Sequence, residues 1–317
     1  MSKIKIACIV GATASGKTDV SVLAAKMLKA EIISADSIQV YKHLDIGSAK
    51  PTENEKCGVI HHMMDCIEPS EKSFSVSEYT QSAKRIIYDI ADRNKLPLIV
   101  GGTGLYINAL TQPLNFAEVG SDEQLRNELK QSEENSPGIL FETLKQIDPI
   151  TAQRLHPNDI KRIIRAIEVF KISGKPLSQH GNDFTNSKGN ESEFESCIIG
   201  ITMPREILYS RIEKRVDIMF EQGLLEETKQ IIDSDGFNRD YPAMQALGYK
   251  QLISYLLDKN PSTLEETIDK IKLETRHFAK RQLTWFRRDK RINWIDITQF
   301  NSKQEAADKI CNIISNF

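Results

Sequence analysis

The sequence lacks the features that mark membrane-embedded and secreted chains. It contains no run of 18 apolar residues, which excludes a transmembrane helix. No small-residue cleavage site follows the short apolar stretch near its start, so we do not interpret that stretch as a signal peptide. The five cysteines are scattered and include no CxxC pair, which argues against a disulfide scaffold and indicates a reducing compartment. We therefore expect a cytoplasmic protein that is not associated with a membrane.

A zinc-binding pattern is also missing. Cys57, His61, His62 and Cys66 are four possible ligands within ten residues, but they lack the paired spacing of structural zinc sites. We therefore do not predict zinc at this segment.

Charge is unevenly distributed over the 317 residues. The formal net charge is −2, yet residues 276–291 (RHFAKRQLTWFRRDKR) hold seven Lys and Arg against one acid, Asp289. On a helix, four of these cations would share one face and four apolar residues the opposite face. The cations are Arg276, Lys280, Arg287 and Arg291, and the apolar residues are Phe278, Ala279, Trp285 and Phe286. We expect the nearly unpaired cations to hold a phosphate backbone; the alternative is an ordinary solvated helix face.

Short apolar segments alternate with helical patterns along most of the chain. The helical patterns include 19–30 and 76–93, and the segments expected to be strands are 3–10, 30–35, 96–100, 196–203 and 291–297. Strands that alternate with helices are typical of parallel sheets covered on both faces. We therefore predict an α/β fold with a three-layer, parallel-sheet core.

One long segment, residues 121–195, does not follow this alternation. It is rich in Glu, Gln and Asn, has helical periodicity around Leu125, Leu140 and 163–170, and ends in the polar stretch GNDFTNSKGNES. We interpret it as an all-helical insertion domain in a core formed by residues 1–120 and 196–317.

A glycine-rich segment between the first predicted strand and the first predicted helix matches G-x-x-x-x-G-K-[ST]. Its backbone N–H groups and the positive end of the helix would surround an anionic oxygen. Lys17 would bring a positive charge to the terminal phosphates, and the Thr18 hydroxyl would ligate Mg²⁺. We predict that a polyphosphate binds to this phosphate loop, which consists of Gly11, Ala12, Thr13, Ala14, Ser15, Gly16, Lys17 and Thr18.

The loop pattern does not identify the polyphosphate. Nucleoside triphosphates are its common ligands, and a pyrophosphate ester would fit the same loop. An ATPase would need an acidic residue at the end of a second apolar strand. Asp36 stands at such a position, but the residues that follow it are more polar than is usual there. The residues by themselves leave both possibilities open.

Further motifs follow in order along nearly the whole chain. They are ADSIQVY (35–41), DIGSAKP (45–51), HHMMD (61–65), PLIVGGTGLY (97–106), HPND (156–159), ISGKPLS (172–178), ALGYKQ (246–251) and KRQLTWFR (280–287). Together with the phosphate loop, they resemble the motifs of the tRNA dimethylallyltransferases, also called tRNA isopentenyltransferases.

This resemblance implies a P-loop, kinase-like fold and a prenyl transfer reaction. Dimethylallyl diphosphate gives its five-carbon group to N6 of the adenosine 3′ of the anticodon, in tRNAs that read codons beginning with U, and diphosphate leaves. In this family the phosphate loop holds the diphosphate of the prenyl donor rather than ATP.

The implied reaction needs a base. The exocyclic amine of adenine is a poor nucleophile, so a proton must leave it as it attacks the allylic carbon. Asp36 is our candidate for this base. The Thr103 hydroxyl is expected to donate a hydrogen bond to the tRNA.

The leaving diphosphate needs positive charge and hydrogen-bond donors. Lys17, Mg²⁺ held by Thr18, the Thr13 hydroxyl and one arginine are the candidates. Arg211 and Arg215 are one helical turn apart, and the family motif favours Arg215.

The resemblance also assigns residues to tRNA binding. Residues 36–39 would contact the target adenine after it unstacks from the anticodon loop. The others would bind the rest of the anticodon stem-loop. The full set is Asp36, Ser37, Ile38, Gln39, Thr103, Arg126, Lys161, Arg162, Ile163, Ile164, Arg165, Gln245, Ala246, Leu247, Gly248, Tyr249, Lys250, Lys280, Arg281, Gln282, Leu283, Thr284, Trp285, Phe286 and Arg287.

The chain departs from the family pattern at Ala12, where proline is usual, and at Ser48, where threonine is usual. It has no zinc finger after Trp294, so it resembles the bacterial form, and we expect a monomer. The alternatives are a P-loop kinase of a small metabolite, a non-catalytic RNA-binding protein and an adenylate isopentenyltransferase. The last should lack both the helical insertion and the basic segment.

Overall fold

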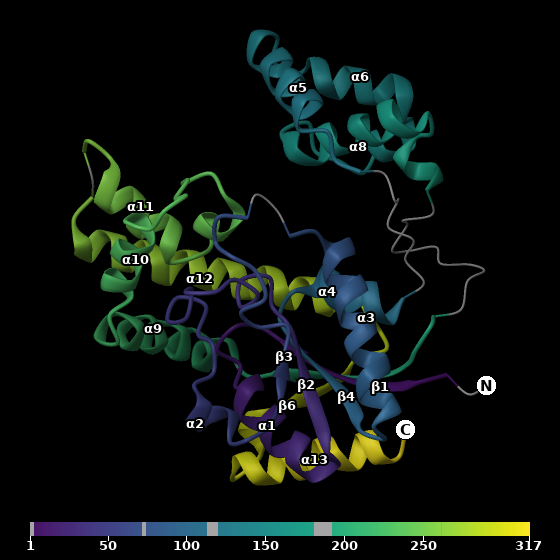
Figure 1. Cartoon of the computed structure of the whole chain (residues 1–317), viewed down its shortest axis with the longest axis vertical. Helices are drawn as coiled ribbons and strands as arrows, with labels where there is room; N and C mark the ends of the chain where they lie inside the picture. Colours follow the sequence, from purple (N-terminus) through teal and green to yellow (C-terminus); the bar gives the residue numbers. More distant parts are fainter. Residues whose placement is uncertain (1–2, 72–73, 113–119, 181–191, 261) are drawn as a thin grey trace. The chain divides into compact units, whose positions relative to one another are not determined.

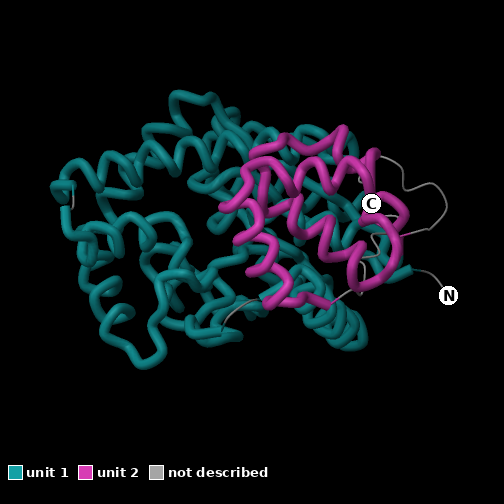
Figure 2. The backbone as a smooth tube through the Cα atoms, turned by 90° about the horizontal axis from the view of Figure 1, so that it is seen from above, with its two compact units in different colours: residues 1–111, 193–317 teal, residues 112–192 magenta. Residues whose placement is uncertain are grey.

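The computed structural model of the chain describes residues 3–71, 74–112, 120–180, 192–260 and 262–317. They form two compact units, coloured separately in Figure 2. Residues 1–111 and 193–317 make the larger unit, and residues 112–192 make the smaller one.

The larger unit is built on a six-stranded sheet with the order β3-β2-β4-β1-β5-β6, in which all neighbouring strands are parallel. The strands are β1 (Lys5–Gly11), β2 (Ala30–Ala35), β3 (His61–His62), β4 (Leu96–Gly101), β5 (Glu195–Thr202) and β6 (Asn293–Asp296). All five predicted strands are present. The sequence did not indicate β3, because two half-buried residues carry no readable periodicity.

Helices cover both faces of this sheet (Figure 1). The helices of the larger unit are α1 (Lys17–Leu28), α2 (Glu53–Lys56), α3 (Val76–Asp92), α4 (Gly104–Thr111), α9 (Arg205–Glu221), α10 (Leu224–Ile232), α11 (Tyr249–Leu257), α12 (Leu264–Phe286) and α13 (Lys303–Ser315), with short 3-10 turns η2 (Pro242–Gln245) and η3 (Ile297–Gln299).

Alternate residues of β1 point to opposite faces of the sheet. Ile6 and Val10 pack with side chains of α3 and α4, whereas Ala7 and Ile9 pack with side chains of α1 and α13. All four are fully buried, as expected for a central parallel strand. The three-layer α/β prediction is therefore confirmed.

A further cluster in the larger unit joins α9, α10, α11 and α12 to the chain that follows β2. Its fully buried members include Val40, Leu44, Leu224, Tyr249 and Leu252. This cluster attaches the segment after β2 to the helices of the second half of the chain.

The smaller unit is helical throughout its described residues. It contains α5 (Glu123–Asn135), α6 (Ile139–Ile147), α7 (Pro149–Ala152), α8 (Ile160–Ser173) and the turn η1 (Leu177–Gln179). Leu140, Leu144, Ile163 and Ile167 form the centre of its core, as the helical periodicity predicts. The polar stretch 181–192 lies outside the described residues except for its last one.

No helix in the described parts of the chain is both long and apolar enough to cross a membrane.

The packing of β1 generates a first prediction. Truncation of Ile9 to alanine should lower the free energy of unfolding by about 2–5 kcal/mol, because it removes buried methylenes and leaves a cavity. Ile207, which is 43% exposed on α9, supplies a matched control whose change to alanine should cost less than about 0.5 kcal/mol. Urea unfolding followed by circular dichroism measures both, and equal losses would contradict the assigned burial.

Candidate active site

The phosphate loop joins the end of β1 to the start of α1. Gly16 is the N-cap of α1 and has a φ of 87°, which favours glycine. A Cβ on Gly11 would lie 2.6 Å from the carbonyl oxygen of Ile201 on β5. The backbone therefore requires both glycines of the motif, and the start of α1 makes the loop suitable for an anion.

Lys17 is the first residue of α1, and its ammonium group donates a hydrogen bond to the Ala12 carbonyl at 2.6 Å. Burial lowers the pKa of Lys17 to about 7, because it disfavours the charged form. The charge of Arg215 also lowers this pKa, and Asp36 opposes the shift. Lys17 is thus only partly charged at neutral pH before an anion enters the loop.

The two arginines on α9 occupy different places. Arg215 lines the same cleft as Lys17 and Asp36, and burial lowers its pKa while Asp36 acts to raise it. The Arg211 guanidinium lies beside the phosphate loop, 3.3 Å from the position that a Cβ on Gly16 would take. Arg211 is exposed and Arg215 half-buried, so Arg215 is the one enclosed in the cleft.

Asp36 follows β2 directly. Its Oδ1 accepts hydrogen bonds from the backbone N–H groups of Ile38 at 2.9 Å and Gln39 at 3.3 Å. These bonds hold the carboxylate over the turn, with Lys17 and Arg215 near enough to respond to its charge.

Thr103 connects the loops that follow β2 and β4. Its Oγ1 accepts a hydrogen bond from the Ser37 N–H at 3.1 Å, and its own N–H donates to the Ala35 carbonyl at 3.0 Å. A Cβ on Gly101 would lie 2.1 Å from that carbonyl oxygen. The close approach of the two loops therefore depends on glycine at residue 101.

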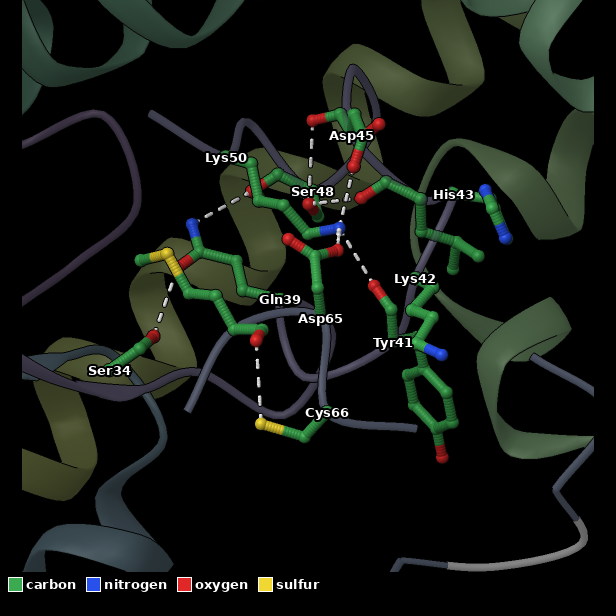
Figure 3. A network of polar contacts seen from close by, with 12 residues as sticks. Ser34, Gln39, Tyr41, Lys42, His43, Asp45, Ser48, Lys50, Asp65 and Cys66 are labelled. Carbon is green, nitrogen blue, oxygen red and sulfur yellow. Dashed lines mark hydrogen bonds and ion pairs between the residues drawn. The ribbon is translucent and has the colours of Figure 1, made fainter. Parts of the chain in front are cut away.

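Gln39 is held by hydrogen bonds on both sides of its amide (Figure 3). Its Oε1 accepts from the Ser34 hydroxyl at 3.0 Å, and its Nε2 donates to the carbonyls of Ser48 at 3.3 Å and Ala49 at 3.2 Å. The amide orientation is thereby fixed from β2 on one side and from the segment after residue 45 on the other.

Gln282 on α12 has a role that the sequence did not indicate. Its Oε1 accepts a hydrogen bond from the Thr13 N–H at 2.8 Å, and its Nε2 donates to the Gly102 carbonyl at 3.1 Å. Gly102 and Gly104 leave the space for Gln282 and Trp285, because a Cβ on either glycine would overlap one of these side chains. A residue assigned to tRNA by resemblance therefore links the phosphate loop to the loop after β4.

Most of these groups line one cleft at the carboxyl edge of the sheet; Thr103 and Arg211 are not part of its lining. Polar groups from the phosphate loop, from the turn after β2 and from α9 face apolar side chains in it. Its lining includes Thr13, Lys17, Thr18, Asp36, Gln39, Ser48, Met64, Val100, Phe278, Arg215 and Gln282. The cleft brings together an anion-binding loop, two cations and a carboxylate.

The His and Cys side chains of residues 57–66 have other partners. His62 Nε2 lies 2.7 Å from the Glu31 carboxylate, and His61 Nδ1 lies 2.8 Å from the Val59 carbonyl. Cys57 and Cys66 approach backbone carbonyls. Within the described residues, no three His, Cys, Asp or Glu side chains are grouped so as to hold a metal ion.

Comparison with known proteins identifies the family of the chain. The family model described as IPP transferase matches residues 39–289. The chain belongs to the IPP transferase family. It is 44% identical over 309 residues to the tRNA dimethylallyltransferase of Alkaliphilus oremlandii (97% of this chain, 96% of the relative), and 45% identical over 307 residues to that of Carboxydothermus hydrogenoformans (96% and 94%).

Two solved structures of the IPP transferase family extend this comparison. The full-length tRNA isopentenylpyrophosphate transferase of Bacillus halodurans is 41% identical, with a TM-score of 0.72 over 99% of this chain and 98% of its own. A eukaryotic dimethylallyltransferase acting on tRNA is 30% identical, with a TM-score of 0.82 over 99% of this chain and 80% of its own.

The basic segment of this IPP transferase differs in part from the predicted helix. The helix α12 ends at Phe286 with Arg287 as its C-cap, still in helical geometry, so the prediction that Arg291 lies on the same helical face is wrong. Beyond the end of α12, the Asp289 carboxylate accepts hydrogen bonds from the Arg291 backbone N–H and guanidinium, in a turn that no longer follows the helix. Lys280, Arg281 and Arg287 are exposed.

Two further expectations for α12 were also wrong. Arg276 forms an ion pair with Glu213 on α9, and Arg291 forms one with Asp289, so these cations are not unpaired. Phe278 is 36% exposed, whereas Ala279 and Phe286 are buried as predicted. Phe278 keeps this exposure because it lines the open cleft, one helical turn before Gln282.

In the smaller unit, two of the candidate tRNA-binding arginines share one carboxylate. Arg126 and Arg165 both form ion pairs with Glu168, which is fully buried. Lys161 and Arg162 are exposed, and Arg162 pairs with Asp159.

The remaining candidate residues differ in exposure. Ile163 and Ile164 belong to the core of the smaller unit, and Ala246, Gly248 and Tyr249 are buried in the larger one. Gln245 and Lys250 are exposed.

The state of Lys17 generates a second prediction. Because its pKa is about 7 in the free protein, binding of inorganic diphosphate should require proton uptake and weaken as the pH rises. We expect the affinity to fall by up to about tenfold per pH unit above pH 7. Isothermal titration calorimetry from pH 6 to pH 9 measures this dependence.

The Lys17→Arg variant is the control, because its side chain stays charged throughout and the titration of diphosphate itself is common to both proteins. Its affinity should change less with pH. Parallel pH profiles for the two proteins would refute the assigned Lys17 pKa.

The exposed cations of α12 generate a third prediction. The double variant Arg281→Ala/Arg287→Ala should bind unmodified tRNA more weakly. The negative slope of log affinity against log salt should become shallower by about 2, one for each lost phosphate contact. The control is Lys26→Ala/Lys309→Ala on α1 and α13, which are also exposed. An unchanged slope in the α12 variant would exclude these arginines from phosphate contact.

Proposed function

We propose that this IPP transferase moves the dimethylallyl group of dimethylallyl diphosphate to N6 of the adenosine 3′ of the anticodon, in tRNAs reading codons that begin with U. The observation that carries this assignment is the cleft in which the phosphate loop, Lys17 and Arg215 face the Asp36 carboxylate. The loop and the two cations would stabilise the leaving diphosphate, and the carboxylate would accept the proton of the amine.

The diphosphate of the donor would occupy the phosphate loop. The start of α1 and its N–H groups would bind the anionic oxygens, with Lys17 and Arg215 opposite the charge that develops on the leaving oxygen. The Lys17 ammonium would exchange its hydrogen bond with the Ala12 carbonyl for one with the diphosphate. The negative charge of the bound diphosphate would raise the pKa of Lys17, so that the protonated form becomes dominant once the anion is present.

Mg²⁺ fits the exposed hydroxyl of Thr18, which adjoins Lys17 on the first turn of α1 and lines the cleft. When bound there together with the diphosphate, it would neutralise part of the leaving-group charge.

The adenine would lie beside Asp36 and Gln39. The N6 nitrogen forms a bond to the allylic C1, the bond from C1 to the diphosphate oxygen breaks, and Asp36 accepts the N6 proton. Thr103 and Gln39 would orient the base through hydroxyl and amide groups. The apolar side chains of Met64, Val100 and Phe278 in the same cleft would contact the five-carbon chain.

The tRNA would be bound along the exposed side of α12 and by the cations of residues 121–195, which we propose to act as the anticodon-binding insertion. The adenine must leave its stack to enter the cleft, as for other enzymes that modify a base. We also propose that the enzyme acts as a monomer in the cytoplasm.

The direct test is incubation of the protein with an unmodified tRNA anticodon stem-loop and dimethylallyl diphosphate, followed by nucleoside mass spectrometry. N6-dimethylallyladenosine is the expected product, confined to the nucleoside 3′ of the anticodon. Labelled ATP in a parallel reaction should transfer no phosphate to small metabolites. Phosphoryl transfer without prenylation would overturn the assignment in favour of a kinase.

The role of Asp36 generates a fourth prediction. Asp36→Asn keeps an oxygen to accept the N–H groups of Ile38 and Gln39 but removes the base. We expect kcat to fall by about 10²–10⁴, the usual contribution of general base catalysis, with tRNA affinity nearly unchanged. Single-turnover kinetics and a binding titration measure the two effects. A variant with wild-type kcat would eliminate Asp36 as the base.

A further inference from the structure

We propose that Glu227 is a positioning residue for the tRNA substrate, acting through the segment 45–50 although its side chain lies outside the cleft. This inference rests on the proposed function. Glu227 lies on α10, outside every motif on which the family resemblance depends.

The Glu227 carboxylate accepts hydrogen bonds from four donors. The backbone N–H groups of Asp45, Ile46 and Gly47 donate to it, at 2.9 Å for the closest contact from Ile46. The Tyr249 hydroxyl donates to its Oε1 at 2.5 Å. A carboxylate that accepts several N–H and O–H groups forms stronger hydrogen bonds than a neutral acceptor.

Tyr249 strengthens this arrangement from α11. Its hydroxyl accepts the Gly47 N–H at 3.0 Å while it donates to Glu227. Burial and the neighbouring carboxylate raise the pKa of Tyr249, so the hydroxyl remains a donor throughout the physiological range. A Cβ on Gly47 would lie 2.5 Å from the Tyr249 ring, so the close contact between segment and ring needs glycine there.

The other end of the segment contacts the cleft. The Ser48 and Ala49 carbonyls accept the two hydrogen bonds from Gln39 Nε2, and both residues line the cleft with Gln39. Gln39 in turn donates its backbone N–H to Asp36. A chain of named contacts thus runs from Glu227 through the segment to the amide and the carboxylate that we place at the adenine.

A buried lysine also fixes the segment 45–50 through polar contacts. The Lys50 ammonium, which is almost fully buried, bonds to Asp45, Asp65 and the Tyr41 carbonyl (Figure 3). Lys50 fixes one side of the segment and Glu227 the other. Loss of Glu227 would leave the N–H groups of Asp45 and Ile46 without their acceptor and Gly47 with the Tyr249 hydroxyl alone, and would allow residues 45–49 to shift relative to Gln39.

The phosphate loop has separate supports. Its Thr13 N–H is bound by Gln282, its Lys17 by the Ala12 carbonyl, and Gly11 packs on β5. The contacts of Glu227 lead to the acceptor side of the cleft. Replacement of Glu227 should therefore affect use of tRNA and spare binding of diphosphate.

The experiment compares Glu227→Gln with Glu226→Gln in the full-length enzyme. The two residues are adjacent on α10 and undergo the same chemical change, but Glu226 is exposed. For Glu227→Gln we expect kcat/KM for the tRNA stem-loop to fall at least about tenfold, since a charged acceptor of several hydrogen bonds is lost. The dissociation constant for inorganic diphosphate should stay within about twofold of wild type. Glu226→Gln should match wild type in both.

Tyr249→Phe keeps the test decisive if Glu227→Gln does not fold. It removes one of the four donors and should lower kcat/KM for tRNA by about threefold, again without a change in diphosphate affinity. The double variant should lose less than the product of the two single effects, because both act on one segment. Thermal unfolding accompanies each measurement.

Equal losses in tRNA use and diphosphate binding would refute the inference, because they would indicate general loosening of the fold. Glu227→Gln kinetics equal to those of Glu226→Gln would refute it as well. Both outcomes leave the proposed function intact as long as the wild-type enzyme prenylates the stem-loop. Absence of prenylation by the wild-type enzyme would instead remove the proposed function itself.

Discussion

The site depends on the parallel order of three neighbouring strands. Because β2, β4 and β1 run in the same direction, the phosphate loop, the turn at Asp36 and the loop at Thr103 emerge at one edge of the sheet. Groups that are far apart in the sequence therefore meet without any long-range rearrangement, which is the general reason that open α/β sheets bind ligands at their carboxyl edge. Glycines at residues 11 and 101 allow the backbones there to approach closely.

The balance of charge in the cleft follows from this convergence. Burial lowers the pKa of both Lys17 and Arg215, the charge of Arg215 lowers that of Lys17 further, and Asp36 partly offsets the shift on both. A polyanion entering the loop would supply the missing negative charge. Without a ligand, the positive charges of the cleft are only partly balanced, and a bound anion would balance them.

Much of this arrangement could be predicted from the sequence. The strand and helix around the phosphate loop, the carboxylate after the second strand and the helical character of residues 121–180 are local signals of periodicity and glycine spacing. Other features depend on partners remote in the sequence. Gln282 faces Thr13 across 269 residues and Glu227 faces Ile46 across 181, and no local pattern distinguishes such side chains from solvated ones. The end of α12 was missed for a different reason: the local turn in which the Arg291 N–H donates to the Asp289 side chain follows residues whose spacing still suits a helix.

The link between Gln282 and the two glycine-rich loops has a bearing on how natural variants are interpreted. The absence of a side chain at Gly102 makes room for Gln282, and at Gly104 for Trp285. A methyl group at either would displace an α12 side chain, and at Gly102 that side chain is Gln282, through which the disturbance would reach the N–H of Thr13. A change at Gly102 would thus act on the phosphate loop through a side chain of α12 that follows it by 180 residues.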